Sequence, residues 1–177
     1  MSTLKNYHDD EALARMIDAA MKTKRTTDTA FRFEKELFRG WLASDKNKPA
    51  DVFQLLKLDL AGDTLLGDPL WKVWVRYIDE FNKISPTPQY YAKIETLRKS
   101  YGDEKLAKLL IAAKEVESTK KTAADLQTLL LNQWILYVDR ATLYLRLNVK
   151  NEPSGSALKV LYHGYLRKYK EIYIAKP

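Results

Sequence analysis

Three pairs of adjacent carboxylates are the residues of this chain best suited to chemistry: Asp9/Asp10, Asp79/Glu80 and Asp103/Glu104. Two carboxylates in different environments can serve as general acid and general base. The first and third pairs, however, each open a helical pattern, where negative charge is stabilised by the helix dipole. The second pair falls on the polar face of its helix, opposite Trp74. We therefore expect these side chains to cap or solvate helices rather than to catalyse a reaction.

Few other groups could act as nucleophiles or metal ligands. The chain has no cysteine, which excludes disulfides, a thiol nucleophile and a cysteine metal site. Its two histidines, His8 and His163, lie far apart, and no serine or threonine has a histidine base nearby. None of the six glycines forms a Gly-x-Gly phosphate-binding pattern. We expect no catalytic residue, no cofactor and no metal site, so the protein is not expected to be an enzyme.

The composition is that of a soluble globular protein. The 177 residues are 46% hydrophobic and 30% charged, and they suffice to bury a real core. No apolar run approaches the roughly 20 residues that a membrane helix needs. Met1 does not open a signal segment. We therefore expect a protein that is either cytosolic or trimmed of a leader, with no membrane partner.

The net charge of +7 is concentrated near the C-terminus, where residues 140–177 hold eight basic and two acidic side chains. Arg167, Lys168 and Lys170 alternate there with tyrosines. They are the candidate partner surface, either for an acidic protein or, as an alternative function, for nucleic acid. Because basic helix faces are common and no nucleic-acid fold motif accompanies this one, we favour a solvated helix face.

Apolar residues recur at helical spacing almost throughout, and no segment alternates convincingly with period two. Proline or aspartate stands at several helix starts, and Gly102 marks a helix end. The segment 122–147 is long for one helix and is expected to break or bend. The fold class predicted is all-α, made of tandem helical-bundle modules. Helices are expected near residues 9–22, 27–43, 48–59, 68–82, 88–102, 103–116, 122–147 and 157–174.

The aromatic side chains of "PLWKVWVRYIDEFN" share one helix face. Trp74, Tyr77 and Phe81 are spaced three and then four residues apart, which places them on one stripe. Such a stripe is typical of a core rather than of a ligand cage. Burying each of these side chains contributes roughly 2 to 3 kcal/mol. We expect Trp74→Ala to cost several kcal/mol through a core cavity.

The sequence repeats itself after 93 residues. Residues 10–42 align without a gap on residues 103–135, and eleven of the thirty-three positions are identical. Chance would give roughly two. A weaker echo relates Trp74, Tyr77 and Phe81 to Tyr162, Tyr165 and Tyr169. The chain therefore reads as helical units of about ninety residues, with an incomplete unit at each end.

Three consecutive motifs carry a family resemblance. "ELFRGWLASDKNKPADVFQLLKLD" resembles the L motif of the LWY modules in RXLR effectors of oomycete plant pathogens such as Phytophthora. "LLGDPLWKVWVRYIDEFN" resembles their W motif. "LRKSYGDEKLAKLLIAAKEVESTKKTAADLQ" resembles their Y motif running into the next L motif. The resemblance covers most of residues 8–135, and the order L, W, Y at this period makes it specific.

The resemblance implies a fold and a function. It implies WY/LWY helical bundles stacked end to end, in a secreted virulence protein that acts inside host plant cells, in the cytoplasm or nucleus. It implies a non-enzymatic scaffold that binds host proteins and suppresses immunity. Some relatives with tandem modules recruit a host serine/threonine phosphatase, and others bind autophagy or RNA-silencing components.

The same resemblance implies domain limits and signature residues. We expect a Y-type part of a first unit over 1–42, an LWY-like module over 43–135 and a degenerate terminal unit over 136–177. The last segment lacks Pro-x-x-Val-Phe and has Tyr162 at the expected tryptophan; the family's leader is also absent. The residues expected in the module joint and core are Trp41, Leu42, Pro49, Val52, Phe53, Leu56, Leu58, Trp74, Tyr77, Phe81, Tyr101 and Trp134.

Overall fold

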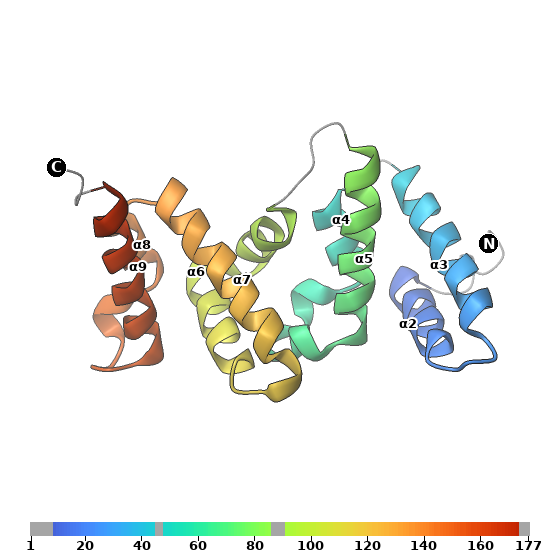
Figure 1. Cartoon of the computed structure of the whole chain (residues 1–177), viewed down its shortest axis with the longest axis horizontal. Helices are drawn as coiled ribbons and strands as arrows, with labels where there is room; N and C mark the ends of the chain where they lie inside the picture. Colours follow the sequence, from blue (N-terminus) through green and yellow to red (C-terminus); the bar gives the residue numbers. More distant parts are fainter. Residues whose placement is uncertain (1–8, 45–47, 86–90, 174–177) are drawn as a thin grey trace. The chain divides into compact units, whose positions relative to one another are not determined.

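A computed structural model describes residues 9–44, 48–85 and 91–173 of the chain. Within these residues the secondary structure is helical and contains no strand, which confirms the all-α prediction (Figure 1). The chain divides into two compact units, Met1–Thr96 and Leu97–Pro177. The limits expected at residues 42 and 135 follow the sequence repeat instead, and they stay a prediction.

The first unit begins with a pair of packed helices joined by a tight turn, α2 (Asp10–Met21) and α3 (Thr27–Leu42). Asp9 caps α2 by accepting the Ala12 N–H at 2.8 Å. In the turn, the Thr26 hydroxyl donates to the Ala20 carbonyl at 2.6 Å. This bond satisfies one of the carbonyls that a helix end leaves without an intrahelical partner.

A compact aromatic segment follows in the same unit. Its last helix begins at Pro69 because the Asp68 carboxylate accepts the Leu70 N–H at 2.8 Å, as the sequence predicted. Lys57 has a left-handed backbone (φ 54°), which ends the preceding helix and turns the chain sharply. The elements are α4 (Pro49–Leu55), η1 (Leu58–Leu60), η2 (Gly62–Gly67) and α5 (Pro69–Ile84).

Helix α6 (Ala92–Ala113) is two helices joined at Gly102, whose φ of 73° and ψ of 166° are not helical. The helix end predicted at this glycine is therefore confirmed. The turn from α6 to α7 (Glu117–Tyr137) repeats the first one, since the Thr119 hydroxyl donates to the Ala113 carbonyl at 2.7 Å. Thr119 and Ala113 stand 93 residues after Thr26 and Ala20. The 93-residue sequence repeat therefore preserves this individual hydrogen bond.

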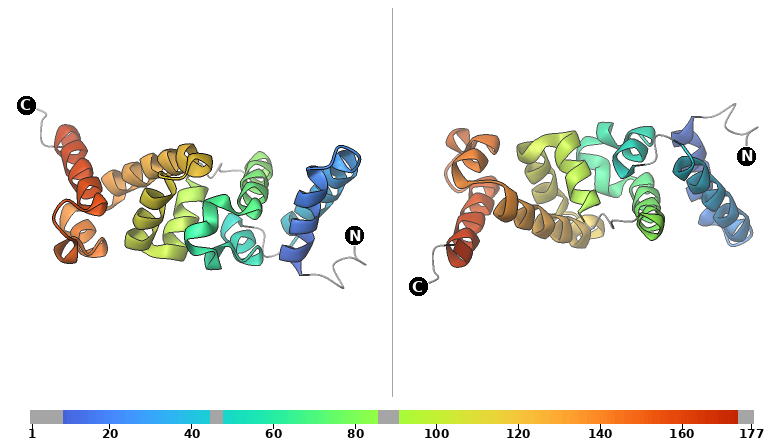
Figure 2. Two further views of the ribbon diagram at one scale, coloured as in Figure 1. Left: turned by 90° about the horizontal axis from the view of Figure 1, so that it is seen from below. Right: turned by 90° about the horizontal axis from the view of Figure 1, so that it is seen from above.

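The long helical pattern over residues 122–147 breaks, as expected, where Val138 is extended. After it come α8 (Arg140–Arg146), η3 (Val149–Asn151) and α9 (Ala157–Tyr173), seen from two further sides in Figure 2. Asn148 has φ 51° between α8 and η3, as Lys57 has a left-handed φ between α4 and η1. The segment expected to be degenerate thus keeps the backbone turn of its counterpart although the sequence motif is lost.

Candidate functional site

One polar contact occurs at equivalent positions of both sequence repeats: a tryptophan indole N–H donates to a carboxylate. Trp41 on α3 donates its indole N–H to Asp10 at 3.2 Å, and Trp134 on α7 donates to Asp103 at 2.7 Å. In both copies the partners are 31 residues apart. The acidic residues that looked like helix caps therefore fix the aromatic ring of the second helix of each pair.

Asp103 is the more buried of these carboxylates and accepts from three donors. Arg98 donates at 2.7 Å and Arg146 at 3.3 Å, in addition to Trp134. Burial would raise the pKa of Asp103, but hydrogen bonds from Arg98 and Trp134 outweigh it and hold the pKa below its ordinary value. The carboxylate is thus a structural anion that ties α6, α7 and α8 together.

Charged side chains reinforce the same repeat positions. Arg15 bonds Glu11 one turn earlier and Asp68 at the start of α5, both at 2.9 Å. Its counterpart Lys108 bonds Glu104 at 2.8 Å and Glu152 at 2.7 Å. Each unit therefore has a basic residue that clamps its first helix to the segment that follows the helix pair.

The aromatic residues of the stripe on α5 form a closed core. The rings of Phe38, Trp41 and Tyr77 contact one another with centroids 5.4 to 5.6 Å apart. Trp74 is fully buried, lies 4.8 Å from Phe53 and donates its indole N–H to the Pro49 carbonyl at 2.7 Å. Such contacts are worth about 0.5 to 1.5 kcal/mol each beyond area burial. These rings therefore build the core of the unit.

The second unit reproduces this core with tyrosines. The Tyr162 hydroxyl donates to the Arg140 carbonyl at 3.2 Å, and Arg140 opens α8 as Pro49 opens α4. The Tyr165 hydroxyl donates to the Val138 carbonyl at 2.9 Å, and burial raises the pKa of Tyr165 to about 12. Tyrosine therefore replaces the donor that tryptophan supplies in the first unit.

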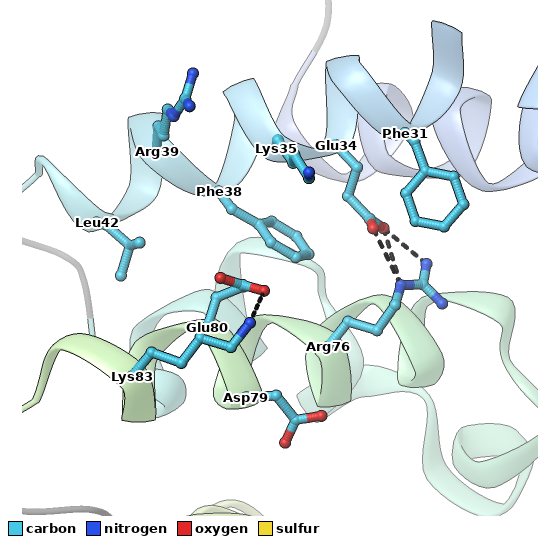
Figure 3. A pocket seen from close by; sticks show the side chains of 10 residues that line it. All are labelled: Phe31, Glu34, Lys35, Phe38, Arg39, Leu42, Arg76, Asp79, Glu80 and Lys83. Carbon is cyan, nitrogen blue, oxygen red and sulfur yellow. Dashed lines mark hydrogen bonds and ion pairs between the residues drawn. The ribbon is translucent and has the colours of Figure 1, made fainter. Parts of the chain in front are cut away.

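A groove between α3 and α5 is the candidate interaction site of the first unit (Figure 3). It encloses about 500 Å³. At one end of the groove the buried Glu34 carboxylate binds the Arg76 guanidinium, with the shortest N–O distance 2.7 Å (Figure 3). Phe31 stands half-exposed beside this pair. The lining residues are Phe31, Glu34, Lys35, Phe38, Arg39, Leu42, Arg76, Asp79, Glu80 and Lys83.

Aromatic and aliphatic side chains line the middle of the groove, and charged side chains of α3 and α5 lie along its two edges. Lys83 binds Glu80 across one turn of α5 at 2.6 Å, and Arg39 binds Glu36 on α3. Lys35 and Asp79 are exposed and have no ion pair among the described residues. An apolar centre with a charged rim is the arrangement found in protein–protein interfaces. The groove can therefore hold a side chain of a protein partner and offer it salt bridges at the edge.

The structure distributes the sequence-predicted residues over three settings. Leu42 and Phe81 are half-buried, and Leu42 lines the groove. Arg167, Lys168 and Lys170 are exposed on α9. The buried members of the expected joint and core are Trp41, Pro49, Val52, Phe53, Leu56, Leu58, Trp74, Tyr77, Tyr101 and Trp134.

Sequence reasoning missed two features. The Asp10–Trp41 and Asp103–Trp134 contacts were hidden because a helix-start carboxylate already has a capping explanation; their equal spacing in both repeats was the available signal. The Glu34–Arg76 pair had no sequence signal, since it joins residues 42 apart in helices that meet only in the fold. Within the described residues, no cluster of acidic or histidine side chains could hold a metal ion, and no helix meets the length and hydropathy of a membrane span.

Residues 36–78 match the family model described as "Effector PexRD54, WY-domain". This stretch holds the aromatic core from α3 to α5. The chain is 38% identical over 136 residues to "RxLR effector protein PSR2" of Phytophthora infestans (strain T30-4), covering 76% of this chain and 18% of that protein. The chain belongs to the RxLR effectors that carry WY modules.

Other members of the RxLR effectors extend the match. "RxLR effector protein PSR2" of Phytophthora sojae is 37% identical over 73% of this chain, which spans 19% of that protein. The solved structure titled "The Crystal Structure of PcRxLR12" superposes with a TM-score of 0.83 at 27% identity, covering 98% of this chain and 42% of that one. The chain thus spans about a fifth of the length of its PSR2 relatives.

Proposed function

We propose that the chain acts as part of a secreted virulence effector, inside the cytoplasm or nucleus of host plant cells. It binds host proteins there as a non-enzymatic scaffold and so suppresses immunity. The support is membership of the RxLR effectors together with buried carboxylates that serve the fold: Asp103 and Glu34 each bind basic partners. Both side chains hold helices together.

The observation that carries the binding role is the groove between α3 and α5. Phe31 is a large aromatic side chain left half-exposed at one end of the groove, while Phe38, two turns further along α3, is buried against Trp41 and Tyr77. Exposed aromatics on a rigid support are frequent hot spots because little side-chain entropy is lost on binding. Lys35, one turn further along α3, supplies an exposed positive charge at the rim.

The test is an affinity capture from plant cell extract at low and at moderate salt, with quantitative mass spectrometry of the retained proteins. Two baits are compared with the parent chain: Phe31→Ala combined with Lys35→Glu, and a matched exposed control, Lys72→Glu on α5. The expected result is a stoichiometric host complex that survives moderate salt and is reduced at least about tenfold by the groove variant only. Equal retention by all three baits would exclude the groove.

We propose a host serine/threonine phosphatase complex as the partner class, with a silencing or autophagy component as the other class that the family suggests. The captured material is therefore assayed for phosphatase activity on a phosphopeptide. Phosphatase activity captured by the parent chain but not by the groove variant supports the phosphatase complex as the partner. A captured complex without that activity moves the proposal to the second.

A second candidate function is nucleic-acid binding through α9. Arg167, Lys168 and Lys170 are exposed, and none of them has an ion pair among the described residues. Each phosphate neutralised should add about 0.9 to the slope of log affinity against log salt on duplex DNA. Replacing all three by glutamine should then flatten that slope; a salt-independent or undetectable signal would remove this candidate.

A further inference from the structure

Two helices of the first unit, α3 and α5, form the walls of the groove and run side by side in the same direction (Figure 3). The α3 wall holds Phe31, Phe38 and Leu42, spaced seven and then four residues apart. The lining residues of α5 follow one another from Arg76 to Lys83 at the same helical spacing. From Phe31 to Leu42 the α3 wall is about 16 Å long. This length matches about three turns of a helix laid along the groove.

The backbone of the two walls favours a helical occupant over an extended one. The main-chain groups of α3 and α5 are bonded within their own helices, so the walls offer no row of donors and acceptors. An extended segment would therefore place its own N–H and C=O groups in the groove without partners, which is unfavourable. A helix satisfies these groups internally and presents side chains at the spacing of the walls.

The two edges of the groove carry opposite charges. Lys35 lies on the α3 side and Asp79 on the α5 side, and both side chains are exposed and without an ion pair among the described residues. Glu80 and Lys83, also on α5, neutralise each other at 2.6 Å. An occupant that is acidic along one flank and basic along the other would therefore find a charge partner at each edge.

The sequence repeat shows which of these side chains the fold does not require. The 93-residue shift that aligns the two helix pairs places Ala124 at the position of Phe31 and Thr128 at the position of Lys35. Helix α7 runs through both positions, as α3 does. The helix pair therefore forms without an aromatic or a basic side chain at these places, which leaves Phe31 and Lys35 available for binding.

We propose that the groove binds an amphipathic helix of a host protein, with acidic residues along one flank and basic residues along the other. The inference rests on the binding role proposed for the groove, and it names the form and the charge of the partner segment. The apolar face of that helix lies along Phe31, Phe38 and Leu42. Its acidic flank pairs with Lys35, and its basic flank pairs with Asp79.

The experiment measures the binding of labelled synthetic peptides to the whole chain by fluorescence anisotropy. Three alanine-rich helical peptides share leucines at positions i, i+4, i+7 and i+11, a spacing that is the same in either direction along the groove. The first has glutamate on one flank and lysine on the other, the second glutamate on both flanks, and the third lysine on both. The parent chain should bind the first about three- to fivefold more tightly than the others.

Single charge reversals at the two edges should change this preference. Asp79→Lys makes both edges basic, so this variant should bind the peptide with two glutamate flanks best. Lys35→Glu makes both edges acidic, so this variant should bind the peptide with two lysine flanks best. Lys72→Glu is the matched control, since Lys72 is exposed on α5 but does not line the groove, and it should keep the order of the parent chain. Circular dichroism checks that each variant is folded.

A fourth peptide tests whether the occupant must be helical. Two central alanines of the first peptide are replaced by proline, which disrupts the helix but keeps every leucine and every charge. This peptide should bind at least about tenfold more weakly. Equal binding of the proline peptide, equal binding of the three charged peptides, or no binding of any peptide overturns the helical partner. The capture from plant cell extract tests the groove separately, because it does not depend on the form of the partner segment.

Discussion

At the residue scale, Asp103 is the carboxylate on which the packing of the second unit depends most. Its carboxylate is almost fully buried and accepts from Arg98, Trp134 and Arg146. Asp103→Asn replaces one acceptor by an amide N–H that faces donors. We expect a loss of about 2 to 4 kcal/mol in the free energy of unfolding, measured by urea denaturation with circular dichroism.

The control for that change is Asp125→Asn. Asp125 is exposed on α7 and has no ion pair among the described residues, so its loss should be within about 0.5 kcal/mol. A similar cost for both variants would mean that the charge of the region, and not the buried acceptor, is what matters.

The same carboxylate predicts a pH dependence. The pKa of Asp103 lies lower in the folded chain than its ordinary value of 3.8, because the bonds from Arg98 and Trp134 outweigh burial. The unfolded chain then binds more protons, so the contribution is fully present above pH 3.8 and is lost as the pH falls below it. Urea midpoints measured through this range should fall more steeply for the parent chain than for Asp103→Asn. Parallel curves would contradict the shift.

The two aromatic donors offer a paired comparison. Trp74 is fully buried and Tyr162 is slightly exposed, yet each donates to the carbonyl of the first residue of a short helix. Trp74→Phe loses a bond and leaves a cavity, so we expect a cost of about 2 to 4 kcal/mol. Tyr162→Phe loses only the bond, at about 0.5 to 1.5 kcal/mol. Both are measured by urea denaturation, and a larger cost at Tyr162 would contradict the equivalence of the Trp74 and Tyr162 hydrogen bonds.

At the element scale, the break in α6 depends on glycine. Gly102 has φ 73° and ψ 166°, a backbone region that is essentially open only to glycine, although a Cβ added there would meet no atom within 4 Å. Gly102→Ala should therefore destabilise the chain by about 1 to 3 kcal/mol through backbone strain alone. Gly67→Ala is the control, because Gly67 also has room for a Cβ but has an ordinary φ. Equal melting temperatures for the two variants would contradict the strain argument.

Helix positions were predictable because they rest on local signals. Apolar spacing, Asp68 before Pro69 and Gly102 after a helical run each act within a few residues. The 93-residue repeat gave information beyond these local signals, because it predicted that residues 103–135 fold as residues 10–42 do. The sequence similarity between repeats is weaker after residue 136, where tyrosines replace the tryptophan and the proline is lost. The left-handed turn at Asn148 nevertheless preserves the backbone conformation there.

Contacts between elements far apart in the sequence could not be predicted from such local signals. Glu34 and Arg76 each look like a solvated charge in their own helix, and only the packing of α3 on α5 removes the carboxylate from water. The sequence likewise gives no signal that Phe31 stays half-exposed beside this ion pair. A hydrophobic pattern identifies a face, but it does not say which part of that face the rest of the fold will cover.

At the scale of the whole molecule, repeat architecture predicts that damage stays local. Stability in such chains is a sum of unit terms and neighbour terms, so a unit can open without its distant neighbours. Trp134→Phe removes the indole donor to Asp103 inside the second unit. Hydrogen exchange followed by mass spectrometry should show faster exchange in α7 and α8, with α2 and α3 unchanged. Trp41→Phe, the equivalent change in the first unit, should give the opposite map. If either variant accelerates exchange evenly from α2 to α9, the chain unfolds as one cooperative body and the two tryptophan–carboxylate contacts do not act as separate joints.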